Sequence, residues 1–156
     1  MKTQGNILFP PKKQKTKYMW RYIERRAQKY SLPVPGTPVP YPLQNFDLAN
    51  KVGLVANNQG WYLEYLREAY KVWFLEGKEA GSEQNLKNTL QNLSKNFYEI
   101  IKKSREEAIN KEYISNTNEA LNKGIFGAPS FSVGNEIFWG DDRLEDVIDF
   151  HRETVK

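Results

Sequence analysis

The chain has 156 residues, a net charge of +4 and 39% hydrophobic residues, which is enough apolar material for one folded core. This composition excludes a disordered chain, and no window reaches the ~18 apolar residues of a membrane span. The absence of cysteine excludes a disulfide scaffold, a thiolate metal site and a Cys-x-x-Cys redox centre, and it fits a cytoplasmic setting. Lys2 precedes no apolar run, so we expect no signal peptide.

The basic residues are concentrated at the N-terminus. Residues 1–30 carry nine Lys and Arg against one acid, Glu24, whereas the remaining residues carry 14 basic and 18 acidic side chains. This asymmetry indicates an anionic partner, which could be a nucleic acid, an acidic lipid or a small anion.

The first predicted element is a helix from about residue 13 to residue 30. Its apolar positions Met19, Ile23 and Ala27 recur every four residues, and Pro33 then ends it. Five prolines follow within residues 33–42, and they predict an extended connection that forms at most a short edge strand.

Residues 47–124 are predicted to be almost entirely helical. Gly60 and residues 76–82 interrupt the pattern, and Ser82 is placed to cap a helix. The aromatic side chains Trp61, Tyr65 and Trp73 recur at helical spacing, which is more typical of a core than of a cofactor site. A long amphipathic helix is predicted for residues 98–122.

The pattern changes after residue 124. Residues 129–133 alternate, Gly134-Asn135 is a hairpin turn signal, and residues 136–139 form a second strand. A final helix begins near Gly140, and His151 on its apolar side is expected to be packed rather than to act as a base. We expect no metal or nucleotide site, because no matching motif occurs.

A hairpin followed by a terminal helix is the second half of a thioredoxin-type fold. Two strands alone are marginally stable in water, and no strong strand precedes them. We therefore predict a predominantly helical α/β fold from which a first βαβ unit of about 30 residues is missing.

Two segments carry a family resemblance. Gly124-Ile-Phe-Gly-Ala-Pro-Ser-Phe131 and Ile137-Phe-Trp-Gly-Asp-Asp-Arg-Leu144 resemble the signature of the glutathione-dependent 2-hydroxychromene-2-carboxylate isomerases, which are related to the kappa-class glutathione transferases. Gly5-Asn6, Lys15-Thr-Lys-Tyr18 and Trp73–Lys78 resemble further family segments in the same order. The resemblance implies a DsbA-like thioredoxin fold with a helical insertion.

The resemblance divides the chain into three parts. Residues 1–43 correspond to a basic helix and a proline-rich connection of the thioredoxin-like domain, residues 44–123 to the helical insertion, and residues 124–156 to the hairpin and terminal helix. The family's thiol-activating Ser would precede Met1, so we expect no catalytic residue in this chain and poor activity from it alone.

The resemblance also implies a glutathione site. Pro129 would follow a cis peptide bond, so that Ala128 offers its backbone to the cysteinyl part of glutathione. Asp142 would hold the γ-glutamyl ammonium group beside Asp141, although one acid at this position also suits a helix cap. Asn6 and Lys15 would reach glutathione or the substrate carboxylate, although Asn6 also suits a turn and Lys15 a solvated charge.

The implied function is glutathione-dependent isomerisation of a small aromatic carboxylate by thiol addition, bond rotation and elimination. The alternatives are a kappa-class-like transferase, a DsbA-family oxidoreductase-like protein and a non-catalytic basic binding module. We expect a homodimer or a complementing N-terminal segment as partner. We expect neither a membrane nor a nucleic acid, because the aromatic residues do not alternate with the basic ones in the pattern of a known nucleic-acid module.

Overall fold

The computed structural model describes residues 13–154. Of these, residues 13–113 belong to one compact unit and residues 114–154 to a second. The predicted α/β fold, predominantly helical with one small sheet, is confirmed. None of the described helices is long and apolar enough to cross a membrane.

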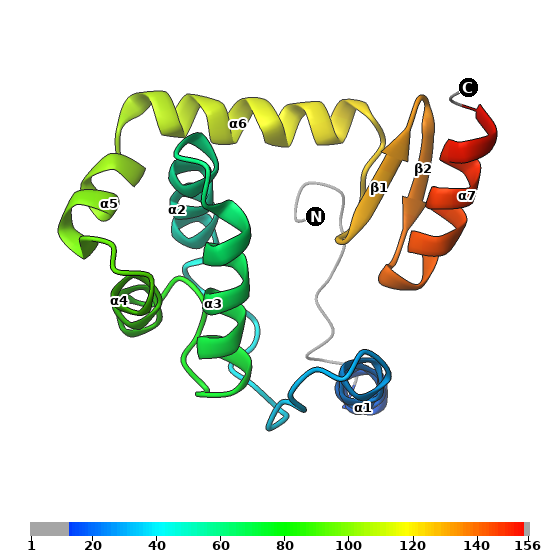
Figure 1. Ribbon diagram of the computed structural model, residues 1–156, viewed down its shortest axis with the longest axis horizontal. Helices are drawn as coiled ribbons and strands as arrows, with labels where there is room; N and C mark the ends of the chain where they lie inside the picture. The colour runs from blue at the N-terminus through cyan, green and yellow to red at the C-terminus, as the bar shows by residue number, and fades with distance from the viewer. Residues whose placement is uncertain (1–12, 155–156) are drawn as a thin grey trace. The chain divides into compact units, whose positions relative to one another are not determined.

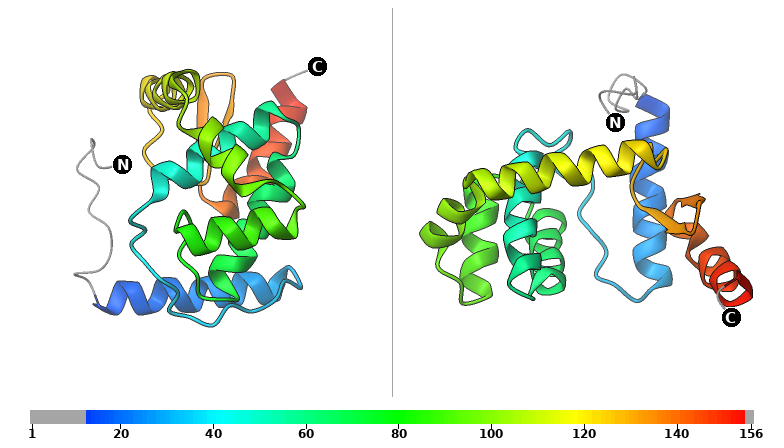
Figure 2. Two further views of the ribbon diagram at one scale, coloured as in Figure 1. Left: turned by 90° about the vertical axis from the view of Figure 1, so that its left-hand side faces the viewer. Right: turned by 90° about the horizontal axis from the view of Figure 1, so that it is seen from above.

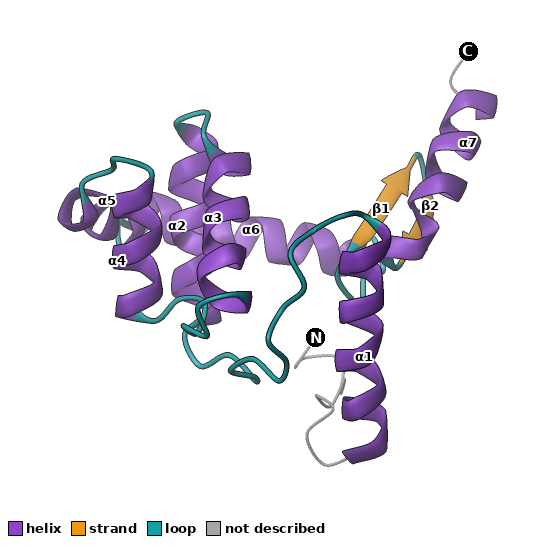
Figure 3. Ribbon diagram, turned by 60° about the horizontal axis from the view of Figure 1, so that its bottom comes forward, coloured by secondary structure: helices purple, strands orange, loops and turns teal. Residues whose placement is uncertain are grey.

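Helix α1 (Lys13–Lys29) begins the first unit, as the four-residue spacing predicts. None of its residues is fully buried. The proline-rich segment that follows is irregular, and Figure 3 draws it as a long loop between α1 and α2. The Thr37 hydroxyl donates a hydrogen bond to Glu24, which ties this loop to the end of α1.

Four helices build the main core of this unit: α2 (Phe46–Asn58), α3 (Tyr62–Phe74), α4 (Glu83–Asn92) and α5 (Phe97–Ser104). They lie against one another in Figures 1 and 2. Leu86 and Leu90 of α4 are completely buried between them. The predicted packing of the aromatic stripe is confirmed, since Trp61, Tyr65 and Trp73 are all buried.

A buried amide joins α3 to α4. The Asn85 side-chain nitrogen donates to the carbonyl oxygens of Ala69, at 3.2 Å, and Lys78, at 3.0 Å. The Ser82 hydroxyl caps the same helix by accepting from the Asn85 backbone N–H at 3.1 Å, as predicted. These bonds fix the start of α4 against the end of α3 and the segment that follows it.

The prediction of one long helix over residues 98–122 is wrong. The structure divides it into α5, which ends at Ser104, and α6 (Glu107–Asn122). The Ser104 hydroxyl donates to the Ile101 carbonyl, and the backbone N–H groups of Arg105 and Glu106 bond three residues back, which tightens and ends the helix. The break lets Ile100 and Ile109 enter the same core.

The second unit contains the hairpin and the terminal helix. Strands β1 (Ser130–Val133) and β2 (Glu136–Trp139) form the predicted antiparallel hairpin, with Phe131 opposite Phe138. A 3₁₀ turn, Asp141–Arg143, leads into α7 (Leu144–Thr154), which lies beside the hairpin in Figure 1. Phe138 packs on Phe150 of α7, with ring centroids 5.6 Å apart. His151, expected to be packed, is exposed, because it is Phe150 that points at the hairpin.

Tyr65 predicts how the first unit responds to alkali. Its hydroxyl donates to the Ala49 carbonyl at 2.8 Å, and burial strongly raises the pKa of the phenol. A raised folded-state pKa gives stability that is complete below the unfolded pKa of about 10 and is lost as the pH rises above it. Above about pH 10, Tyr65 should make the unfolding free energy of the unmodified protein fall by about 1.4 kcal/mol per pH unit. We expect Tyr65→Phe to abolish this contribution to the pH slope.

The measurement is urea unfolding of both proteins between pH 8 and pH 11. Tyr98→Phe is the matched control, because Tyr98 is 77% exposed. Equal pH slopes for the Tyr65→Phe variant and the unmodified protein would contradict the prediction.

Candidate ligand site at the start of the hairpin

The site begins where the chain enters β1. The Ala128–Pro129 peptide is cis, as the sequence motif predicts. Ala128 and Pro129 are exposed. Within residues 13–154, neither the N–H nor the carbonyl of Ala128 has a hydrogen-bond partner. These two groups form an open peptide edge next to the hairpin.

The other side of the site is the turn after β2. The Gly140 N–H donates to the Pro129 carbonyl at 3.0 Å and extends the ladder by one step beyond the strands. Gly140 has a φ of +117° and lies against the Asp142 carboxylate, so a side chain here would collide with Asp142. This hydrogen bond brings Ala128, Pro129, Asp141 and Asp142 into one neighbourhood.

The acidic turn is held by Arg143. Its guanidinium donates to Asp142 at 3.0 Å and to Asp146 at 2.8 Å. The hydrogen bond and charge of Asp142, followed by the charge of Asp146, raise the pKa of Arg143 above its ordinary value. Asp142 and Asp146 share this one guanidinium, and Asp141 precedes them in the chain.

An aromatic pair borders the open edge. The Trp139 indole lies directly over the Cα of the buried Gly127, and a Cβ at Gly127 would stand 3.0 Å from two of its ring carbons. The Phe126 ring meets the indole edge-on with centroids 5.1 Å apart. Trp139 is nevertheless 55% exposed. The absence of a side chain at Gly127 therefore allows the Trp139 indole to pack in this position.

The structure does not place the two remaining predicted site residues relative to this neighbourhood. Lys15 is exposed on α1 and belongs to the first unit, not to the cluster formed by residues 114–154. Asn6 lies outside the described residues. Within residues 13–154, no group of His, Cys, Asp and Glu side chains is arranged to hold a metal ion.

Sequence reasoning missed two residues of this neighbourhood. The family motifs contain Arg143 and Gly127 but do not predict their roles. Arg143 holds Asp142, and Gly127 leaves room for Trp139. The strand register that pairs Ser130 with Trp139 brings the two motifs together. A two-residue turn at Gly134-Asn135 fixes this register, so the sequence contains the signal that predicts it.

Residues 1–150 match the model of the DsbA-like thioredoxin domain. The chain belongs to the DsbA-like thioredoxin family. It is 28% identical over 132 residues to a 2-hydroxychromene-2-carboxylate isomerase of Sphingobium xenophagum, which covers 84% of this chain and 65% of the relative. The chain therefore spans slightly less than two thirds of the curated relative that it matches.

A solved structure of a 2-hydroxychromene-2-carboxylate isomerase has the same fold as this DsbA-like chain. The TM-score is 0.76 at 22% identity, over 90% of this chain and 68% of the other. The expected resemblance to the isomerases is thus confirmed.

Proposed function

We propose that this chain binds glutathione and takes part in the glutathione-dependent isomerisation of a small aromatic carboxylate of the 2-hydroxychromene-2-carboxylate type. The similarity to an isomerase over 84% of the chain supports the reaction class. The observation that carries the proposal is the open peptide edge at Ala128 beside the turn that contains Asp141 and Asp142.

The residues present fit the two ends of glutathione. The N–H and carbonyl of Ala128 would pair with the cysteinyl backbone, as an extended peptide pairs with a strand edge. Asp142 would accept a charge-assisted hydrogen bond from the γ-glutamyl ammonium group, with Asp141 beside it. Lys15 and Asn6 are proposed to contact glutathione or the substrate carboxylate.

When bound, glutathione would supply the thiolate that adds to the unsaturated acid and leaves after bond rotation. This chain's contribution is to orient the tripeptide. The poor activity of this chain alone stays a prediction.

Asp142→Asn is expected to weaken glutathione binding about 10- to 150-fold, because a hydrogen bond to a charged group is lost. Isothermal titration of the purified chain with glutathione measures this effect. Asp149→Asn is the matched control, since Asp149 lies on α7, pairs with Arg152 at 3.3 Å and carries the same charge.

A glutathione analogue without the γ-glutamyl amino group separates the contact from a general loss of charge. The unmodified chain should prefer glutathione to this analogue, and Asp142→Asn should bind both equally. A preference that survives in Asp142→Asn would contradict the role of Asp142 in the proposed site.

The open hairpin also supports the proposal of a homodimer or a complementing segment. In the described part of the chain the sheet has only two strands, and exposed strand edges recruit further strands. A cytoplasmic location is likewise proposed.

A further inference from the structure

Helix α1 has a basic half, of which the proposed function uses only Lys15. The helix contains seven Lys and Arg residues and one acid, Glu24, which accepts from Arg21 at 2.7 Å and from Thr37. At 100° per residue, six of the seven cations fall within about half of the helix circumference. They are Lys15, Lys17, Arg21, Arg25, Arg26 and Lys29.

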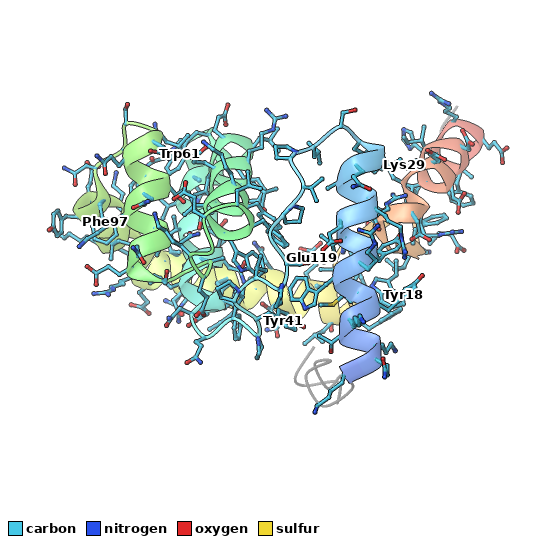
Figure 4. The ribbon with its side chains drawn as sticks, turned by 90° about the horizontal axis from the view of Figure 1, so that it is seen from below. Tyr18, Lys29, Tyr41, Trp61, Phe97 and Glu119 are labelled. Atoms are coloured by element: carbon cyan, nitrogen blue, oxygen red, sulfur yellow. The ribbon has the colours of Figure 1, made fainter. Side chains whose placement is uncertain are left out.

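Tyrosine rings lie in the middle of this half. Tyr18 and Tyr22 stack with centroids 6.4 Å apart and planes inclined by 18°, and Tyr18 is 63% exposed. The Arg25 guanidinium lies 5.5 Å from the Tyr18 centroid. Tyr18 and Lys29 are labelled on α1 in Figure 4. The helix therefore presents cations and aromatic faces together on one half of its circumference.

The opposite half of α1 is apolar and partly covered within the first unit. Trp20 meets Tyr41 edge-on at 5.9 Å and packs against the cluster of Val39, Trp73 and Ala80. A helix that binds a membrane surface needs its apolar half for insertion. The partial covering favours a partner recognised by the basic half alone.

We infer that the basic half of α1 binds single-stranded nucleic acid. Lysine and arginine would contact the phosphates, and the exposed Tyr18 ring would stack on a base, which is how sequence-tolerant single-strand binding works. This inference is independent of glutathione binding. It departs from our expectation about nucleic acid because the helix brings Tyr18 and Tyr22 onto the same half as the cations, although the sequence lacks the pattern of a known module.

The test is fluorescence anisotropy of a labelled 20-nucleotide oligothymidine with the purified chain between 50 and 300 mM salt. Each phosphate contact contributes about 0.7 to the slope of log affinity against log salt. The double variant Arg25→Gln/Lys29→Gln should reduce this slope by about 1.4, which corresponds to ~25-fold weaker binding at 0.1 M salt if the two lines meet at 1 M.

Two further variants complete the test. Arg67→Gln/Lys102→Gln removes one arginine and one lysine that are exposed on α3 and α5, and it should leave the slope unchanged. Tyr18→Leu should weaken binding about 5- to 150-fold through lost stacking, with the same slope. Far-ultraviolet circular dichroism checks that each variant keeps its helix content.

Three outcomes overturn the inference: absence of binding at 50 mM salt, equal slope changes in the two double variants, or binding to phosphatidylserine vesicles without binding to the oligonucleotide. Equal affinity for a duplex of the same length, undiminished by Tyr18→Leu, also overturns it, because stacking would then contribute nothing.

Discussion

Gly81→Ala is expected to lower the unfolding free energy of the first unit by about 2–6 kcal/mol. Gly81 is buried with a φ of +84°, and a Cβ there would collide with the Asn45 carbonyl oxygen and stand 2.9 Å from its carbon. The left-handed backbone costs an L-residue ~1–3 kcal/mol, and overpacking against backbone adds ~1–3 kcal/mol. Urea unfolding followed by circular dichroism measures the loss.

Gly77→Ala separates these two costs. Gly77 has a φ of +68°, but a Cβ there would meet nothing within 4 Å. Gly77→Ala should therefore lower the unfolding free energy only by the cost of the left-handed backbone. If the two variants lose the same stability, the close approach of Gly81 to Asn45 has no energetic consequence, and the prediction is wrong.

Leu86→Ala is expected to cost about 2–5 kcal/mol, the range for a leucine truncated in a well-packed core. Leu86 is fully buried on α4, in the cluster that includes Val52, Tyr65 and Ile100. Chemical unfolding gives the stability, and binding of a hydrophobic dye reports loosened packing.

Leu63→Ala is the control for the truncation itself. Leu63 lies on α3 and is 60% exposed. Its truncation should therefore change the unfolding free energy by no more than about 0.5 kcal/mol. Similar losses for both leucines would mean that α4 does not anchor the core.

Local sequence signals predicted much of the fold. The hairpin follows from alternation around Gly134-Asn135, and the start of α4 follows from Ser82, because these features depend on residues within a few positions. The break between α5 and α6 could not be predicted in this way. It depends on Ile100 and Ile109 reaching one core, which is a contact between helices rather than a property of either.

The candidate site shows the same division. Family motifs predicted Ala128, Pro129 and Asp142, and the structure brings them together through the Gly140–Pro129 hydrogen bond. The motifs did not predict that Asp142 shares Arg143 with Asp146. The positions of these residues in the sequence do not show which carboxylates the Arg143 guanidinium will bind. An incoming ammonium group must therefore compete with Arg143 for Asp142.

The buried Asn85 amide has a consequence for which changes in chain length the protein tolerates. One nitrogen holds the carbonyls of Ala69 and Lys78, so the chain between them has a fixed end-to-end span. An inserted residue in 70–77 must bulge outward or break one of these two hydrogen bonds, at a cost of about 1–3 kcal/mol. The exposed stretch at residues 31–34 is bracketed by the part-buried Thr37–Glu24 hydrogen bond and by no buried amide of this kind. Length variation should therefore be tolerated between α1 and α2 and resisted between α3 and α4.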